Sequence, residues 1–493
     1  MSVPMLKNYV NGQWLEPTCD GYLAVEDPST GDTIAQAPLS TADEMNQAVE
    51  AAHAAYGSWS RLPVARRVAY LYELNAILQR EEDAIARTLV REMGKSMVDA
   101  RAEMKRIFEN IEVACAMPVL QQGDRLIGAS AGIDGEVIRL PLGVFGMIPP
   151  FNFPAMVPFW FLPYAIASGN TYVVKPSEQV PCTMQLIAEH IHATGLPPGV
   201  FNLVNGDKTA AGALIDHPRV QGISFVGSTA VCRQVAERCA RQNKRFQAMG
   251  SAKNHLVVMP DARISEAVRN MCTSCFGCAG QRCMAASAIV CVGDDTYRRV
   301  CDDFIAAARE VKVGNPLDPA LVDEPNAMGP VISAKAKQRI LELIETGTKE
   351  GATLALDGRG LVVPGCEKGH FIGPTIFTDV KPGMKVHTTE IFGPVVVMME
   401  ADSLDEAIAI INRGDYGNGG SIYTQSGYRA RKFKLETNVG MVGVNVGIPA
   451  PVAYLPFGGM KASQWADIKA QAKAVINFFT EDKIVTERWW PPQ

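Results

Sequence analysis

Four apolar segments decide the fold: Val144-Phe145-Gly146-Met147-Ile148, Thr171-Tyr172-Val173-Val174, Val200-Phe201-Asn202-Leu203-Val204 and Gly222-Ile223-Ser224-Phe225-Val226. Stretches of helical character lie between them, one running to Ala167 and two more over 184–194 and 208–215. Buried strands that are joined by helical crossovers form a parallel sheet. Residues 143–226 therefore predict an α/β domain built on such a sheet.

A parallel sheet binds its ligands beyond the carboxyl ends of its strands. The loops at these ends are Pro149–Asn152, Lys175–Glu178, Asn205–Asp207 and Gly227–Thr229. None of them contains the Gly-x-Gly-x-x-Gly pattern of classical dinucleotide sites. Ser228 and its neighbours precede a predicted helix over 231–239, where backbone N–H groups can hold a phosphate. The alternative for this serine is an ordinary helix cap.

Outside this sheet, the sequence predicts a short hairpin, a helical region and a second α/β unit. Tyr9-Val10-Asn11-Gly12-Gln13-Trp14 alternates around an Asn-Gly turn, and Thr41 with Glu44 forms a capping box. The apolar periodicity then predicts helices over 64–78, 81–93 and 95–116. The second unit follows Lys253, with strands predicted over 255–258, 288–292 and 395–399.

Two segments point outward from these units. Residues 123–140 are glycine-rich and alternating, which predicts an exposed hairpin, and its free edge needs a partner. We therefore expect a subunit interface there. The tail over 475–480 is aromatic and strand-like, and together with Trp489 and Trp490 it is expected to dock on a neighbouring subunit.

Length and composition exclude several function classes. The chain has 493 residues, so two large domains are expected. Of these residues 47% are hydrophobic and 20% charged, and the net charge is −5, so we expect no basic surface for nucleic acid. Residues 140–174 carry no charge, but their six prolines argue against a membrane span. The amino terminus shows no targeting pattern, and the 12 cysteines lack secreted-scaffold spacing, so free thiols and a cytoplasmic location are expected.

The stretch Cys272-Thr-Ser-Cys-Phe-Gly-Cys-Ala-Gly-Gln-Arg-Cys283 concentrates four thiols. Cys283 is the predicted nucleophile, because it follows a small turn and lies beside Arg282, whose charge would favour the thiolate. The spacing also approaches that of an iron–sulfur site, although its last gap is one residue too long and no proline follows. For Cys272, Cys275 and Cys278 we expect a buried stripe along a helix, and we expect no metal.

Five motifs resemble the aldehyde dehydrogenase superfamily in order and spacing: Pro150-Phe-Asn-Phe-Pro154, Val174-Lys-Pro-Ser-Glu178, Phe225-Val-Gly-Ser-Thr229, Gly280-Gln-Arg-Cys283 and Glu390-Ile-Phe-Gly-Pro394. The resemblance covers the whole chain. It implies an α/β fold of two Rossmann-like domains with a β-hairpin oligomerisation arm. The implied boundaries are 1–121 and 141–249 for an NAD-binding domain, 250–470 for a catalytic domain, and 122–140 with 471–493 for the arm.

The resemblance also implies NAD(P)-dependent oxidation of an aldehyde through a thioester. Cys283 would attack the aldehyde and the amide of Asn152 would stabilise the oxyanion. The implied cofactor contacts are Phe151, Lys175, Glu178, Gly206, Gly227, Ser228, Glu390 and Phe392. A carboxylate at Glu178 accepts hydrogen bonds from ribose hydroxyls but repels a 2′-phosphate, which favours NAD over NADP.

One departure from the superfamily pattern bears on the second half of the reaction. Hydrolytic members carry Glu-Leu-Gly-Gly-Lys, whose glutamate activates water, whereas this chain reads Met249-Gly-Ser-Ala-Lys253. Methionine cannot accept a proton, so a thiol is the expected acyl acceptor. Gly-Ser-Ala-Lys-Asn-His and Gly-Gln-Arg-Cys-Met-Ala are similar to the methylmalonate-semialdehyde dehydrogenase branch, which acylates coenzyme A.

That branch recognises an acidic substrate with arginines, and Arg282 and Arg106 stand at the corresponding positions. A surface ion pair is the alternative for Arg106. Gln464-Trp465 replaces a usual glycine, so malonate semialdehyde or a sulfonated aldehyde remains open as substrate. The alternatives to an acylating enzyme are a hydrolytic aldehyde dehydrogenase, an iron–sulfur carrier and an inactive binding protein. A homodimer or homotetramer is expected.

Overall fold

The computed structural model describes residues 3–19 and 21–492. Within them the largest sheet has eight strands in the order β2-β1-β9-β8-β7-β10-β11-β23. Its central strands β9, β8, β7, β10 and β11 are parallel, and antiparallel strands close both edges. This confirms the predicted parallel sheet. The bounds are β1 (Asn8–Val10), β2 (Gln13–Leu15), β7 (Val144–Ile148), β8 (Thr171–Val174), β9 (Phe201–Leu203), β10 (Val220–Val226), β11 (Arg245–Met249) and β23 (Gln464–Trp465).

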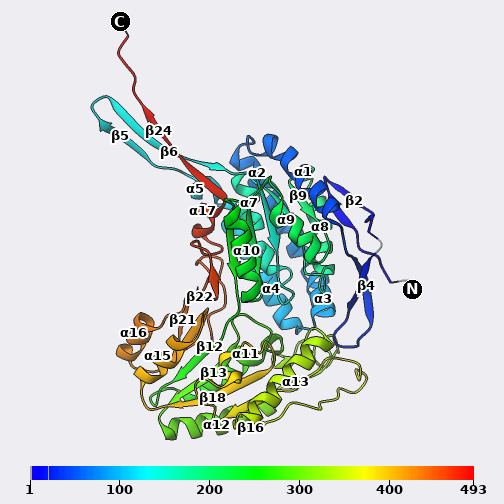
Figure 1. The fold of residues 1–493 in the computed structure, drawn as a ribbon, viewed down its shortest axis with the longest axis vertical. Coiled ribbons are helices and arrows are strands. Elements are labelled where there is room, and N and C mark those ends of the chain that lie inside the picture. Colours follow the sequence, from blue (N-terminus) through cyan, green and yellow to red (C-terminus); the bar gives the residue numbers. More distant parts are fainter. Residues whose placement is uncertain (1–2, 20, 493) are drawn as a thin grey trace.

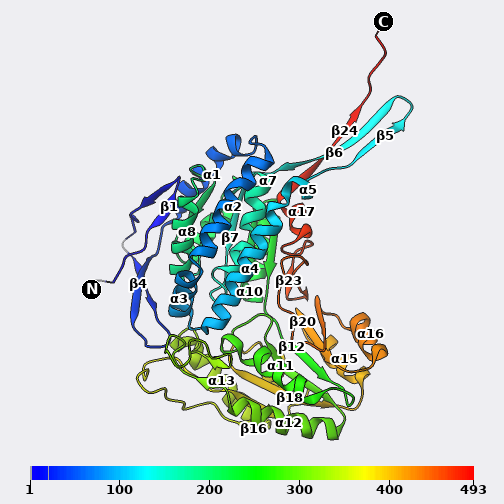
Figure 2. The same ribbon diagram turned by 180° about the vertical axis from the view of Figure 1, so that it is seen from behind.

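Helices cover both faces of this sheet, and its five central strands are accordingly mostly buried on both sides. One face carries α1 (Ala42–Trp59), α9 (Lys208–Asp216) and α10 (Thr229–Arg241), which lie in front in Figure 1. The opposite face, seen in Figure 2, carries the helices predicted over 64–116, which are α2 (Val64–Arg80), α3 (Glu82–Met93) and α4 (Met97–Cys115). The same face carries α5 (Met117–Leu120), α6 (Met156–Phe159), α7 (Leu162–Ser168) and α8 (Cys182–Ala193).

Local signals near the amino terminus are also confirmed. Tyr9 pairs with Trp14 across the Asn-Gly turn, and this hairpin joins the edge of the sheet. At the start of α1, the Thr41 hydroxyl accepts the Glu44 N–H at 3.3 Å, while the Glu44 carboxylate accepts the Thr41 N–H at 2.8 Å. A separate two-stranded ribbon, β3 (Tyr22–Glu26) with β4 (Thr33–Pro38), lies between hairpin and helix in the chain.

The second α/β unit is built on a seven-stranded sheet in the order β16-β17-β18-β13-β12-β20-β21, parallel except for β16. The strands are β12 (Asn254–Val258), β13 (Ala286–Val292), β16 (Thr353–Leu356), β17 (Thr375–Thr378), β18 (Val395–Ala401), β20 (Gly419–Tyr423) and β21 (Met441–Val444). The helices are α11 (Ile264–Phe276), α12 (Asp294–Arg309), α13 (Ala334–Lys349), α14 (Lys385–Thr388), α15 (Leu404–Arg413) and α16 (Gly427–Glu436). The two-domain α/β prediction is confirmed.

A three-stranded sheet projects from the body of the molecule, as both ribbon views show. It contains the predicted hairpin, β5 (Arg125–Ser130) and β6 (Ile133–Pro141), and β24 (Thr480–Glu487), which pairs with β6 from Thr480↔Pro141 to Glu487↔Asp134. Leu126, Ile127 and Ile484 are exposed on it. We call these strands the arm. Its contact with another subunit stays a prediction.

The tail prediction is wrong for residues 475–479. This segment forms a 3-10 turn, η2 (Lys473–Val475), and one helical turn, α17 (Ile476–Phe479), before β24 begins. A strand would point Phe478 and Phe479 to opposite faces, whereas the helical turn lets both rings pack against Phe145, with centroid distances of 5.3 and 4.8 Å. The guanidinium of Arg245 then donates hydrogen bonds to carbonyls at the end of this turn.

In the described part of the chain, no helix is both long and apolar enough to cross a bilayer. All 12 cysteines lie in the described residues and are free. Across residues 3–19 and 21–492, no three His, Cys, Asp or Glu side chains gather where they could hold a metal ion.

Candidate active site

Cys283 lies where two cavities meet. A cavity of about 340 Å³ opens between α4, α6 and the segment that follows α11, and one of about 660 Å³ opens at the carboxyl ends of β7, β8 and β10. Cys283 lines both. Its carbonyl accepts hydrogen bonds from the amides of Asn254, at 2.8 Å, and Asn418, at 3.1 Å, so the backbone at the predicted nucleophile is held by β12 and by the residue before β20.

A tight turn brings Cys283 to this position. The turn η1 (Gly277–Gly280) contains Cys278 and Ala279 with φ near +50°, followed by Gly280 with φ +70°. A Cβ at Gly280 would stand 2.1 Å from the carbonyl oxygen of Gly393, so the turn packs directly against the loop that carries Glu390 and Phe392. Glycine at 280 is required by its backbone conformation and by this close approach.

The expected buried helical stripe of three cysteines is correct in full only for Cys275, because Cys272 lies on α11 but is half-buried, and Cys278 is buried but lies off the helix. Gly277 ends that helix, and Cys278 lies beyond it in the left-handed turn. The Cys278 thiol lies 3.3 Å from Nε of Arg282 and 3.5 Å from a carboxylate oxygen of Asp99. The helical spacing therefore predicted the wrong surroundings for Cys278, because the chain leaves the helix one residue earlier.

The electrostatic surroundings of Cys283 differ from expectation. Burial and the negative charge of Glu390 raise its pKa to about 12. The charge of Arg282 lowers this pKa, which is the predicted direction, but burial and Glu390 outweigh it. The guanidinium itself forms an ion pair with Asp99. Activation of Cys283 by Arg282 stays a prediction.

Three of the four loops predicted to hold a ligand line the larger cavity, and Asn205–Asp207 does not. Phe151, Asn152, Lys175, Glu178, Gly227 and Ser228 all face it, and Glu390 and Phe392 face it from the second domain. The Phe151 and Phe392 rings meet edge to face at 5.7 Å, and Phe392 has a positive φ of 57°. Such a backbone conformation is costly for a bulky residue and is typical of functional sites.

The polar groups in this cavity are oriented by hydrogen bonds. The buried Lys175 ammonium donates to a Glu178 carboxylate oxygen at 3.1 Å and to the Gly206 carbonyl at 2.8 Å. Gly206 thus acts on Lys175 and does not itself line the cavity. Ser228 occupies the N-cap position of α10, yet its side chain makes no capping hydrogen bond. Its hydroxyl is therefore not used as an ordinary helix cap.

Glu390 is held on the opposite wall. Its carboxylate accepts the Ala252 N–H at 2.9 Å, and burial raises its pKa. The ammonium of Lys253 donates to the carbonyls of Val386 and Thr389, at 2.7 and 3.1 Å, and burial lowers the pKa of Lys253 to about 7. The loop that presents Glu390 is therefore anchored from within the domain.

Asn152 is linked to the nucleophile through the backbone. Its amide donates to the carbonyl of Gln281 at 2.8 Å, and its own carbonyl accepts the ammonium of Lys95 at 2.7 Å. Lys95 forms an ion pair with Glu103 in which both side chains are 0% exposed, and Glu103 also accepts the N–H groups of Ala155 and Met156. The motif around Asn152 is thus fixed by a fully buried ion pair.

Lys95 and Glu103 were not predicted from the sequence. The one signal was Glu103 itself, a charged residue on the apolar stripe of α4, next to Met104 and in line with Ala100 and Ile107. A carboxylate at such a position needs a buried partner. Nothing in the sequence identified that partner as Lys95.

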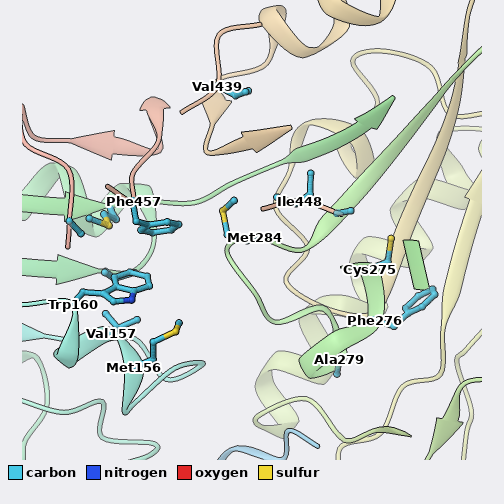
Figure 3. Close-up of a cluster of buried hydrophobic side chains, with 14 of the residues drawn as sticks. Met156, Val157, Trp160, Cys275, Phe276, Ala279, Met284, Val439, Ile448 and Phe457 are labelled. Atoms are coloured by element: carbon cyan, nitrogen blue, oxygen red, sulfur yellow. The ribbon is translucent and has the colours of Figure 1, made fainter. Parts of the chain in front are cut away.

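The smaller cavity is lined by apolar side chains and both predicted arginines. Met156, Met284 and Ile448 contribute apolar surface, and Figure 3 shows Met284 between the cluster around Met156 and Trp160 on one side and Ile448 on the other. Arg106 lines the cavity, but its Nη1 donates to both carboxylate oxygens of Glu109, at 2.6 and 2.9 Å, in an ion pair. The geometry thus places both arginines beside Cys283, each with a carboxylate partner.

Met249 ends β11 and is buried, with 4% exposure. Its carbonyl accepts the N–H of Gly227, while the next two residues, Gly250 and Ser251, line the larger cavity. No proton acceptor is available from this position. The unusual Trp465 lies on β23, which pairs with β11 at the sheet edge, and its ring lies under the guanidinium of Arg233.

Comparison with known proteins agrees with this geometry. The model of the family described as "Aldehyde dehydrogenase family" matches residues 14–485. Malonate-semialdehyde dehydrogenase 1 of Geobacillus thermodenitrificans (strain NG80-2) is 44% identical over 488 residues, which cover 99% of each chain.

Solved structures agree over the full length. One from Sinorhizobium meliloti 1021, provisionally named a methylmalonate-semialdehyde dehydrogenase and complexed with NAD, has a TM-score of 0.97 at 39% identity and covers 100% of this chain and 99% of its own. Methylmalonate-semialdehyde dehydrogenase from Oceanimonas doudoroffii has a TM-score of 0.96 at 38% identity, with 99% of each chain covered. These matches confirm the resemblance seen in the five motifs, and the chain belongs to the aldehyde dehydrogenase family of oxidoreductases.

Proposed function

We propose that the protein oxidises malonate semialdehyde or its methyl homologue with NAD and transfers the acyl group to coenzyme A. The observation that carries this proposal is the position of Cys283, between a cavity that holds two arginines and a cavity lined by the cofactor loops. The names of the most similar relatives support the same substrate class.

The residues of the larger cavity fit NAD. Gly227 and Ser228 stand at the amino terminus of the 13-residue helix α10, where backbone N–H groups and the uncapped hydroxyl suit a diphosphate. Lys175 and Glu178 would bind the adenine ribose, with Gly206 fixing Lys175, and Glu390 with Phe392 and Phe151 would bind the nicotinamide side. NAD, when bound, supplies the hydride acceptor.

In the first half-reaction the thiol of Cys283 gives its proton to solvent water, and its sulfur attacks the aldehyde carbon. The carbonyl electron pair moves to oxygen. One N–H of Asn152 is used by Gln281, and its second N–H would stabilise this oxyanion together with the N–H of Cys283. When the oxyanion reforms its double bond, the carbon gives up a hydride and a thioester remains on Cys283.

In the second half-reaction the absence of a base at Met249 favours a thiol acceptor. The thiolate of coenzyme A attacks the thioester carbonyl, its carbon–sulfur bond forms, and the bond to Cys283 breaks. If the acyl group bears a β-carboxylate, loss of CO2 could precede this transfer. Cys283 leaves as thiolate and recovers a proton.

A hydrolytic reaction is the second candidate, and one observation favours it. Glu390 lines the same cavity as Cys283 and its pKa is raised, so its carboxylate could accept a proton from water. In that case the product is a free acid. The same two arginines would also accept a sulfonated aldehyde, because a sulfonate offers them similar oxygens.

The proposal extends to organisation and location. Residues 1–121 and 141–249 would form the NAD-binding domain, 250–470 the catalytic domain, and 122–140 with 471–493 the oligomerisation arm of a homodimer or homotetramer. The exposed apolar residues Ile127 and Ile484 on the arm are suited to such a contact. The free cysteines are suited to the reducing cytoplasm.

Rapid mixing with malonate semialdehyde and NAD tests the acyl acceptor. We expect a burst of NADH equal to the enzyme concentration without coenzyme A, and steady turnover when coenzyme A is added. Mass spectrometry should then find an acyl-coenzyme A product. Free acid alone, formed at an undiminished rate in the presence of coenzyme A, would show that the hydrolytic candidate is correct.

A further inference from the structure

Gly277 is a glycine that its backbone does not require. It ends α11 with φ −54° and ψ 139°, a conformation open to any residue. What excludes a larger residue is the side chain of Arg282. A Cβ at position 277 would stand 2.3 Å from the guanidinium carbon and 2.4 Å from both terminal nitrogens. The guanidinium of Arg282 therefore lies directly on the Cα of Gly277.

Three acceptors fix the guanidinium in this position. Its Nε donates to the Cys278 thiol at 3.3 Å, Nη1 to the Thr273 carbonyl at 3.4 Å, and Nη2 forms the ion pair with Asp99. The Cys278 N–H in turn donates to the Asp99 carboxylate at 2.9 Å. The left-handed turn at Cys278 makes this arrangement possible, because it folds the chain back so that Arg282 lies over Gly277.

A count of donors shows what remains for a ligand. A guanidinium has five N–H groups, and Cys278, Thr273 and Asp99 use three of them. One N–H is left on each terminal nitrogen. Two such donors match the two oxygens of a carboxylate. Since Arg282 lines the cavity beside Cys283, its orientation decides whether these donors reach a bound aldehyde.

We propose that Gly277 is a specificity-determining positioning residue, which makes room for the Arg282 guanidinium and thereby selects an anionic aldehyde. Gly277 does not line the substrate cavity and acts only through Arg282. This inference rests on the proposed function, because it assumes that the substrate carries a carboxylate.

The test is the substitution Gly277→Ala. The three atoms nearest to the added methyl group all belong to the far end of the Arg282 side chain, so the fold should tolerate the substitution while the guanidinium is displaced. We expect kcat/KM for malonate semialdehyde to fall roughly 30-fold or more, mainly through KM, by analogy with a broken charge pair. The value for propanal, which has no carboxylate, should change less than about threefold.

A double-mutant cycle separates positioning from a general structural role. In an Arg282→Leu background, adding Gly277→Ala should change neither rate, because no guanidinium remains to be displaced. Gly57→Ala is the matched control, since a Cβ at Gly57 meets nothing within 4 Å. If Gly277→Ala fails to fold but the double variant folds, the contact with the guanidinium is confirmed.

Four results would overturn the inference. In folded Gly277→Ala they are an equal loss on both aldehydes, or no loss on either. In the double variant it is an additional loss relative to Arg282→Leu, and the fourth is misfolding of both Gly277→Ala and the double variant. A failure of the proposed function is distinguishable, because it is measured on the unsubstituted enzyme alone as a lack of preference for malonate semialdehyde over propanal.

Discussion

The buried Lys95–Glu103 pair should be a main support of the Asn152 loop, and Lys95→Met tests this. The substitution keeps the length of the side chain but leaves the Glu103 carboxylate buried with only the N–H groups of Ala155 and Met156. It also removes the donor to the Asn152 carbonyl. Breaking one partner of a buried pair typically costs about 3–5 kcal/mol.

The expected change in melting temperature follows from the size of the chain. An unfolding entropy of about 2.1 cal/mol/K per residue gives roughly 1 kcal/mol/K for 493 residues. The loss in Lys95→Met therefore corresponds to a fall in Tm of about 3–5 °C. Because the backbone carbonyl of Asn152 loses the Lys95 donor, the Asn152 side chain should be held less firmly, and the rate constant of the NADH burst should also fall.

Circular dichroism melting and rapid-mixing measurement of NADH are suitable assays. Lys349→Met is the matched control, since Lys349 pairs with Glu345 on the surface with 73% and 55% side-chain exposure. It should shift Tm by less than about 0.5 °C, because exposed pairs contribute little. Adding Glu103→Gln to Lys95→Met should restore most of the stability, since an amide oxygen can still accept the two N–H groups. A Tm within 1 °C of the unsubstituted protein in Lys95→Met would refute the reasoning.

Three further predictions concern the site. Cys283→Ala should abolish NADH formation, including the burst. Cys275→Ala, which changes a buried residue of α11, should lower Tm and retain activity. Total loss of activity in a folded Cys275→Ala variant would contradict the assignment of the nucleophile. Glu178→Ser should lower the ratio of kcat/KM with NAD to kcat/KM with NADP about tenfold, because the carboxylate that repels a 2′-phosphate is removed. An unchanged ratio would mean that Glu178 does not face the ribose. Since the pKa of Cys283 is raised to about 12, the rate of its alkylation by iodoacetamide should rise about tenfold per pH unit between pH 7 and 9. At each pH the rate should be higher in Glu390→Gln, because a negative charge that raises this pKa is removed. A plateau below pH 9 would show that the thiolate is already formed.

The sequence was sufficient for the architecture and for most site positions. Apolar strands between helical stretches predict the parallel sheet, because a strand buried on both faces must be apolar throughout. The loops after β7, β8 and β10 could then be named as the ligand edge, and their residues do line the larger cavity. The five motifs identified the family, since their order and spacing are far more specific than any one of them.

The tertiary structure alone decided how charges are distributed in the site. Sequence adjacency showed that Arg282 stands beside Cys283, but it did not show that the fold brings Asp99, 183 residues earlier, to the guanidinium. The same holds for Lys95 beneath Asn152 and for Phe478 and Phe479 against Phe145. Pairings between distant residues depend on how the elements pack, and a local pattern records periodicity and propensity but not which remote side chain completes an ion pair.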